Sequence, residues 1–141
     1  MREILFRGKC LHDNEWFEGE SILQNNDFTL IAKAVTLGIN EKGIANLIRD
    51  SIFNAVIPET VGQYTGLTDK NGTKIFEGDI VLVYYSDGLI EKGCIGWSDI
   101  SIRYTFASPD GSGYGIDVTD TFEVIGNIYD NPELLGGATN D

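Results

Sequence analysis

The chain has 141 residues, of which 42% are apolar and 23% charged, a composition typical of globular proteins and not of disordered ones. A chain of this length forms one domain, or a domain with a small subdomain, and buries enough surface to fold without disulfides. No apolar run approaches the ~18 residues that a membrane span needs. Charged residues interrupt the short apolar patch at the N-terminus, so we expect no signal peptide and a cytoplasmic protein.

The net charge of −12 is distributed unevenly along the chain. Residues 1–56 hold six Lys or Arg and eight Asp or Glu, whereas residues 57–141 hold four and fourteen, and no basic residue follows Arg103. Because nucleic-acid binding neutralises phosphates with clustered Lys and Arg, we expect no direct nucleic-acid partner and no membrane partner. A protein partner with a basic surface fits this charge better, although negative charge also serves solubility alone.

The first third of the chain contains predicted strands at residues 3–11 and 15–24, joined by the polar turn His12–Glu15. A third apolar, β-branched run at residues 28–37 predicts another strand. The period then changes, because apolar side chains recur at steps of three and four within residues 40–56. This spacing predicts one amphipathic helix, with Asn40 as its N-cap and an apolar stripe of Ile44, Leu47, Ile48, Ile52 and Ala55.

After Pro58, which ends any helix, short strands alternate with turns. The tip Asp69–Gly72 contains Asn-Gly, which readily adopts positive φ, and it predicts a tight hairpin between strands at residues 61–67 and 74–76. Residues 108–117 are rich in Gly and Ser and are predicted to be a loop. Further strands are predicted at residues 80–85, 89–97, 99–107 and 121–129.

These elements define a mainly β protein. We expect residues 1–56 to form an N-terminal β-hairpin region with one amphipathic helix. Residues 57–141 are expected to form a small β-barrel or sandwich of the SH3-like-barrel type. The two regions are expected to form one compact unit.

Few residues are placed for chemistry. His12 is the sole histidine, so no cluster of imidazole ligands can form. Cys10 and His12 are a nucleophile and a base two positions apart, which by itself is only a weak indication of catalysis. Residues 69–80 resemble a calcium loop but carry Ile80 where the bidentate Glu is needed. Residues 111–115 lack the lysine of a phosphate-binding loop. We therefore expect no metal, no cofactor and no catalytic residue, although 22 carboxylates leave an enzyme with a carboxylate-based site as an alternative.

The segment Pro58–Val83 holds glycines at positions 62, 66, 72 and 78, which we expect at bends and turns. Its polar and aromatic residues either brace the turn by hydrogen bonds or line a binding surface, and bracing is favoured. Asp79 is expected to bind backbone amides of its own turn. The candidate binding residues are Glu59, Thr60, Gln63, Tyr64 and Asp79.

Four segments of the chain resemble, in order and wording, the pattern of the YopX family. They are FRGK from Phe6, EWFEG from Glu15, PETVGQYTGLTDKNGTKIFEGDIV from Pro58 and EVIGNIYDNPEL from Glu123. Residues 24–55 depart from the family pattern. The resemblance implies a mainly β, oligomeric protein of bacteriophages and prophages, located in the bacterial host cell, with no established biochemical role.

Three functions are open from the sequence. The preferred one is a non-enzymatic, self-associating phage accessory module that binds a host or phage protein through an acidic face. A second is an acidic mimic of nucleic acid that inhibits a host DNA-binding protein, and a third is an enzyme with a carboxylate-based or metal-dependent site. The apolar helix and exposed sheet edges, which need covering, favour a homo-oligomer.

Overall fold

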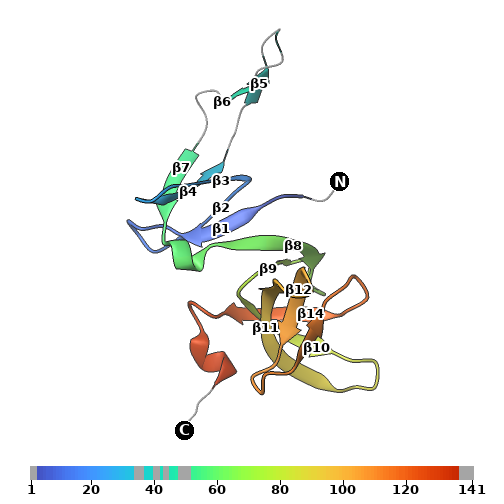
Figure 1. The fold of residues 1–141 in the computed structure, drawn as a ribbon. Helices are drawn as coiled ribbons and strands as arrows, with labels where there is room; N and C mark the ends of the chain where they lie inside the picture. Colours follow the sequence, from blue (N-terminus) through green and yellow to red (C-terminus); the bar gives the residue numbers. More distant parts are fainter. Residues whose placement is uncertain (1–2, 34–36, 40–41, 43–44, 48–51, 137–141) are drawn as a thin grey trace. The chain divides into compact units, whose positions relative to one another are not determined.

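The structure is a computed structural model that describes residues 3–33, 37–39, 42, 45–47 and 52–136. The chain divides into two compact units at the bond between Gln63 and Tyr64, within strand β8 (Gly62–Thr68) (Figure 1). The first two residues of β8 pair with β1 of the first unit, and Tyr64 and Thr68 pair with β9 of the second. Among the residues described, no helix has the length and apolar character that crossing a membrane requires.

The first unit consists of short antiparallel strands and one 3₁₀ turn. These elements are β1 (Phe6–Lys9), β2 (Trp16–Gly19), β3 (Ser21–Gln24), β4 (Thr29–Lys33), β5 (Leu37–Ile39), β6 (Ala45–Leu47), β7 (Ile52–Val56) and η1 (Pro58–Thr60). β1 and β2 form a hairpin, and β4 lies between β3 and β7 in a three-stranded sheet. β5 and β6 pair with each other.

The core of the first unit lies where the β1–β2 hairpin packs on β4 and β7. Ile31 of β4 and Val56 of β7 are fully buried there. β2 approaches β4 so closely that a Cβ built on Gly19 would lie 2.3 Å from the carbonyl oxygen of Ala32. The glycine that ends the EWFEG segment is therefore required by packing, because no side chain fits between the two strands.

The amphipathic helix predicted for residues 40–56 is wrong where the structure describes this segment. Leu47 lies in β6, and Ile52 and Ala55 lie in β7, which pairs along its whole length with β4. Ile and Phe also favour strands, and the ladder with β4 prevails over the three-and-four spacing. Outside the described residues lie Asn40, Ile44 and Ile48.

The second unit contains the remainder of β8 and the elements that follow it. They are β9 (Lys74–Phe76), β10 (Asp79–Tyr84), β11 (Ile90–Ser98), β12 (Arg103–Ala107), β13 (Gly113–Gly115), β14 (Phe122–Asn127) and a 3₁₀ turn, η2 (Pro132–Leu135). β8 and β9 form the predicted hairpin. The other strands form one antiparallel sheet in the order β13-β12-β11-β10-β14.

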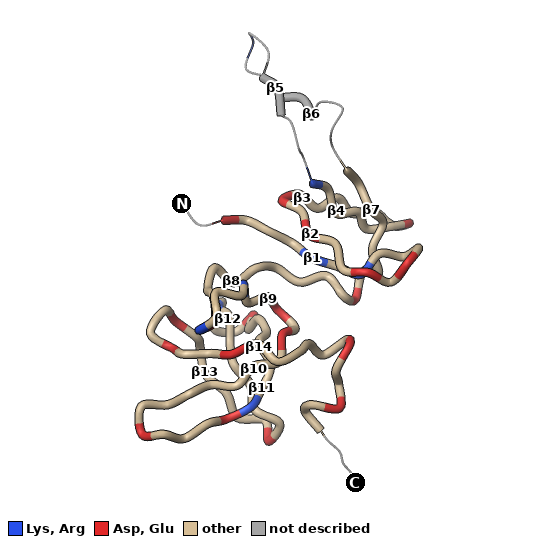
Figure 2. Tube along the Cα trace, turned by 180° about the vertical axis from the view of Figure 1, so that it is seen from behind, with Lys and Arg blue, Asp and Glu red and all other residues tan. Residues whose placement is uncertain are grey.

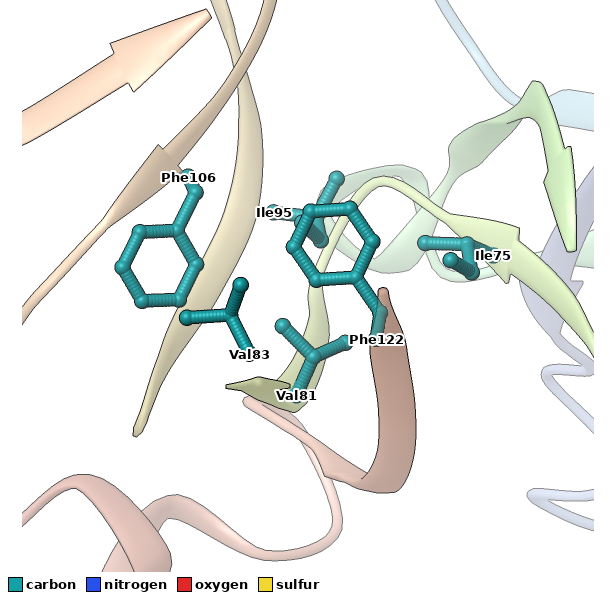
Figure 3. Close-up of a cluster of buried hydrophobic side chains, with 6 residues drawn as sticks. All are labelled: Ile75, Val81, Val83, Ile95, Phe106 and Phe122. Carbon is teal, nitrogen blue, oxygen red and sulfur yellow. The ribbon is translucent and has the colours of Figure 1, made fainter. Parts of the chain in front are cut away.

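The core of the second unit gathers six buried side chains (Figure 3), namely Ile75, Val81, Val83, Ile95, Phe106 and Phe122. Val81 and Val83 are two positions apart on β10 and so point to the same face of the sheet. The rings of Phe106 and Phe122 stack with their centroids 6.4 Å apart. At ~1.5–3 kcal/mol for each buried apolar side chain, this cluster is the main source of the unit's stability.

The barrel expected for residues 57–141 does not close. The sheet begins at β13 and ends at β14, and in the part of the chain that the structure describes no ladder joins these two edges. β13 has three residues, each of which pairs only with β12. It lies within residues 108–117, so the loop predicted there is wrong at Gly113–Gly115. The mainly β class is confirmed, as several open antiparallel sheets.

The hairpin tip predicted at Asp69–Gly72 is confirmed. Gly72 has φ +86° and donates its backbone N–H to the carbonyl oxygen of Asp69 at 3.0 Å. Oδ1 of the buried Asp69 carboxylate accepts hydrogen bonds of 2.9 Å from the N–H groups of Asn71 and Thr73, and Oδ2 accepts one of 2.9 Å from Val124. The tip is thereby fastened to β14.

Candidate functional site

Three of the predicted binding residues lie in the first unit. Thr60 is buried, and its hydroxyl accepts a hydrogen bond from the N–H of Lys9 at 2.9 Å and donates one to the carbonyl of Ile57 at 2.6 Å. Thr60 therefore braces η1 against β1. Its neighbour Glu59 is exposed, and Gln63 is half-buried on β8.

Tyr64 and Asp79 lie in the second unit, where both contact Phe76. The buried ring of Tyr64 lies 5.7 Å from the ring of Phe76, measured between centroids. Asp79 is 2% exposed, and its Oδ2 accepts the N–H of Phe76 at 2.8 Å, which confirms the expected bond within its own turn. Both side chains serve the packing of β9. Binding by the five candidate residues stays a prediction.

A groove of about 430 Å³ lies within the second unit. Its lining comes from β8, from the end of β11, from the turn before β12, from β12 itself and from the segment after β13. The apolar lining residues are Leu67, Trp97, Ile102, Tyr104, Ile116 and Val118. The sequence does not predict this groove, because its residues come from distant segments with no shared local pattern.

The rim of the groove exposes large apolar side chains. Trp97 is 45% exposed, Ile102 72% and Val118 82%. The indole N–H of Trp97 donates to Oδ1 of Asp99 at 3.0 Å, and its ring meets Tyr104 edge-on at 5.0 Å. The indole is thus held in place without being covered. Apolar side chains gathered around a hollow are typical of surfaces that bind proteins or peptides.

The turn between β11 and β12 carries a backbone outlier at this rim. Ile102 has φ +54°, a left-handed conformation that a β-branched residue rarely adopts. Its neighbour Ile100 is 97% exposed, so burial does not explain the apolar character of this turn. Strained backbone of this kind often lies at binding sites, where it fixes the position of a side chain.

Two charges line the groove, one of each sign. Arg103 extends over β13, because a Cβ built on Gly115 would lie 1.9 Å from its Nε. Asp117 accepts the hydroxyl of Thr119 at 2.5 Å and the N–H of Thr119 at 2.8 Å. These bonds hold the pKa of Asp117 below its ordinary value, and the Arg103 charge lowers it further. Asp117 is therefore a fixed negative charge near neutral pH.

The second unit, which holds the groove, is acidic as a whole. Residues 64–141 hold four Lys or Arg against thirteen Asp or Glu, a balance of −9, and Figure 2 shows acidic segments along the loops of this unit. In the loop before β13, hydrogen bonds from the hydroxyl of Ser108 and from the hydroxyl and N–H of Ser112 lower the pKa of Asp110 to about 2. The loop therefore keeps its negative charge over the physiological pH range.

A third group of side chains meets in the turn between β1 and β2. Cys10, His12 and Asp13 place one ligand atom each within 4.8 Å of one another. Burial raises the pKa of the Cys10 thiol, and the carboxylates of Asp13 and Glu15 raise it further. A protonated, buried thiol is a poor nucleophile, so this turn does not support the Cys10–His12 catalytic pair.

Fold and site define a small, mainly β protein whose second unit carries an open groove with an apolar rim. The YopX protein family model matches residues 5–136, so the chain belongs to this family. The chain is also similar to the crystal structure of protein EF1440 from Enterococcus faecalis, with a TM-score of 0.55 and 27% sequence identity, over 96% of this chain and 100% of that one. The comparison with curated proteins gives no match.

Proposed function

We propose that this protein is a non-enzymatic phage accessory module that binds a segment of a host or phage protein in the groove of its second unit. The proposed occupant is an extended peptide that inserts a bulky apolar side chain between Trp97, Ile102 and Val118 and carries Lys or Arg beside it. The association with phages is inferred from the YopX family, to which the chain belongs.

The exposed apolar rim carries this proposal. Trp97 is fixed by Asp99 and Tyr104 yet remains 45% exposed, so its ring is available to a partner without rearrangement. A pre-positioned indole loses little conformational freedom on binding, and Trp is enriched among the residues that dominate binding energy.

Charge selects the flanking residues of the occupant. The surrounding unit has a balance of −9, and Asp117 in the groove holds its negative charge firmly. A cationic residue beside the inserted side chain therefore gains from the acidic surface. Arg103 is the exception in the groove, and it suits a carbonyl or carboxylate of the peptide.

Self-association belongs to the same proposal. The predicted helix, one of the features that favoured it, is wrong in the described residues, so its support is the family resemblance and the edges of the five-stranded sheet, β13 and β14. Light scattering at micromolar concentration is expected to give a mass above that of one chain. A mass equal to that of one chain would exclude self-association without contradicting peptide binding in the groove.

A nucleic-acid mimic is a second candidate, favoured by the acidic loops on either side of β13. Asp110 and Asp117 both have depressed pKa values, and no Lys or Arg follows Arg103. If the captured partner binds DNA, competition between this protein and a DNA duplex supports mimicry. Simultaneous binding of both would exclude it.

Selection from a displayed library of random peptides tests the binding function. The wild-type protein is expected to enrich peptides with a bulky apolar residue next to Lys or Arg. A Trp97→Ala, Val118→Ser double variant is expected to lose the enrichment, while Leu89→Ala, at an exposed apolar residue outside the groove, keeps it. Enrichment of the same peptides by the groove variant would overturn the proposal.

A further inference from the structure

The turn between β1 and β2 brings together a thiol, an imidazole and a carboxylate. Sγ of Cys10, a ring nitrogen of His12 and an oxygen of Asp13 lie within 4.8 Å of one another. Cys10 is 4% exposed, whereas the side chains of His12 and Asp13 are exposed to 68% and 45%. The thiol of the cluster is therefore buried, and its imidazole and carboxylate are open to solvent.

The backbone of this turn is fixed at several points. The N–H of Cys10 donates to the carbonyl of Glu15, and the N–H of Asn14 donates to the carbonyl of Cys10, both at 2.9 Å. The next residue, Leu11, donates its N–H to the carbonyl of Ala55 in β7 at 2.9 Å. The ligand atoms therefore extend from a frame that is tied to the neighbouring sheet.

The carboxylate of Asp13 is oriented by the same turn. Its Oδ1 accepts the N–H of Glu15 at 2.9 Å, which leaves Oδ2 facing Nε2 of His12 at 3.2 Å. One Zn²⁺ ion can bind both atoms, because metal–ligand bonds of ~2.0–2.2 Å reach a nitrogen and an oxygen that lie 3.2 Å apart. The carboxylates of Asp13 and Glu15 also act electrostatically on Cys10, so the potential around the sulfur attracts a cation.

We propose that Cys10, His12 and Asp13 form a Zn²⁺ site. Zn²⁺ accepts thiolate, imidazole and carboxylate ligands together, at ~2.0 to 2.3 Å, whereas Mg²⁺ and Ca²⁺ prefer oxygen. Small rotations of the exposed His12 and Asp13 side chains bring their atoms around one ion. Zn²⁺ then displaces the proton of the Cys10 thiol, which is released to solvent water, and a water molecule fills the fourth position.

Cobalt substitution tests the site on the full-length protein. Co²⁺ added to the metal-free, reduced protein is expected to produce a sulfur-to-cobalt charge-transfer band at one equivalent, and Zn²⁺ is expected to abolish it by displacement. The band reports thiolate coordination directly and needs no enzymatic activity.

Variants at the exposed ligands identify the partners of the thiol. His12→Gln and Asp13→Asn are each expected to weaken Co²⁺ and Zn²⁺ binding by at least about tenfold, since even residues that only orient ligands change affinity by that factor. Both positions are exposed, so neither change threatens folding. Cys10→Ser is expected to remove the band, with circular dichroism as the check that the variant folds.

The matched controls are Cys94→Ser, at the second free cysteine, and Asp27→Asn, at an exposed carboxylate of the same unit. Both are expected to keep the band and the affinity. Absence of a charge-transfer band would overturn the proposal, as would a band that survives both His12→Gln and Asp13→Asn or disappears in Cys94→Ser.

Discussion

The carboxylate of Asp69 accepts a hydrogen bond of 2.9 Å from the backbone N–H of Val124, a residue 55 positions later in the chain. Its other oxygen accepts the N–H groups of Asn71 and Thr73. One buried side chain thus shapes the β8–β9 hairpin tip and ties it to β14. The tip also determines where β8 ends, and β8 contributes Leu67 to the groove.

Replacing Asp69 by Ala is expected to lower the free energy of unfolding of the second unit by at least about 3 kcal/mol, because it removes three hydrogen bonds to a charged acceptor, each worth ~1.5–3 kcal/mol, and leaves their donors partly unsatisfied. Urea unfolding followed by Trp97 fluorescence measures this in a Trp16→Phe background, which removes the tryptophan of the first unit. Asp87→Ala is the control, because Asp87 is exposed and accepts one N–H, from Leu89. Equal losses at both positions would contradict the role given to Asp69.

The same carboxylate predicts a pH dependence. Burial raises the pKa of Asp69, but the N–H groups of Val124, Thr73 and Asn71, with the charge of Lys70, outweigh burial and set the pKa below its ordinary 3.8. A carboxyl with a lowered folded pKa stabilises the folded state above its unfolded pKa and loses that contribution as the pH falls through the folded pKa.

The second unit is therefore expected to lose stability as the pH falls below about 4, and Asp69→Asn is expected to be less stable at neutral pH but to lose less on acidification. Parallel unfolding titrations of the two proteins measure the difference, in which the effects of Asp110 and Asp117 cancel. Identical acid profiles would contradict the predicted sign.

In the first unit, Gly19→Ala is expected to cost at least about 2 kcal/mol, since the added methyl would lie 2.3 Å from the carbonyl oxygen of Ala32. Trp16 fluorescence in a Trp97→Phe background reports unfolding of this unit. Gly96→Ala, followed by Trp97 fluorescence in the Trp16→Phe background, is the matched change, because its Cβ meets no atom closer than 3.9 Å, and it is expected to be nearly neutral in the second unit. A tolerated alanine at position 19 would mean that β2 and β4 can move apart.

Local chemistry predicted the turns but not the long-range pairing. The residues Asp69–Gly72 require a tight turn wherever the chain goes, and the structure has one there. Ile52 and Ala55 fit helical spacing equally well. They lie in a strand because they pair with β4, and no local pattern of the sequence indicates that pairing. The prediction of a closed barrel is wrong for the same reason, because closure depends on whether the two edge strands of the sheet pair with each other.

The two candidate sites also could not be predicted from local sequence patterns. The groove joins Leu67, Trp97 and Val118, which are separated by many residues, and nothing in the sequence says that they face one hollow. The nearest sequence signal of the groove is the pair of isoleucines at positions 100 and 102. The sequence predicts them in a strand, and the structure places them in the exposed turn Asp99–Ile102. The sequence marks Asp13 only as a turn residue, and its approach to Cys10 and His12 follows from the backbone of the turn, which no local pattern predicts.

Ile102→Gly separates stability from binding. Glycine at φ +54° relieves a left-handed backbone strain of ~1 kcal/mol, so this variant is expected to be as stable as the wild type or more stable. It removes an apolar side chain from the groove rim and is expected to weaken peptide binding. Ile100→Gly, at the neighbouring exposed position without positive φ, should give no stabilisation and no loss of binding. Destabilisation by Ile102→Gly beyond that of Ile100→Gly would contradict the strain argument.

The most direct measurement is a calorimetric titration of a library-selected peptide into the wild-type protein and into Trp97→Ala and Leu89→Ala. If the groove binds a partner segment, Trp97→Ala weakens the affinity by at least about tenfold, as expected for an aromatic side chain that anchors a peptide, and Leu89→Ala leaves it within about twofold. Equal affinity in all three proteins would show that the peptide binds elsewhere and would contradict the account.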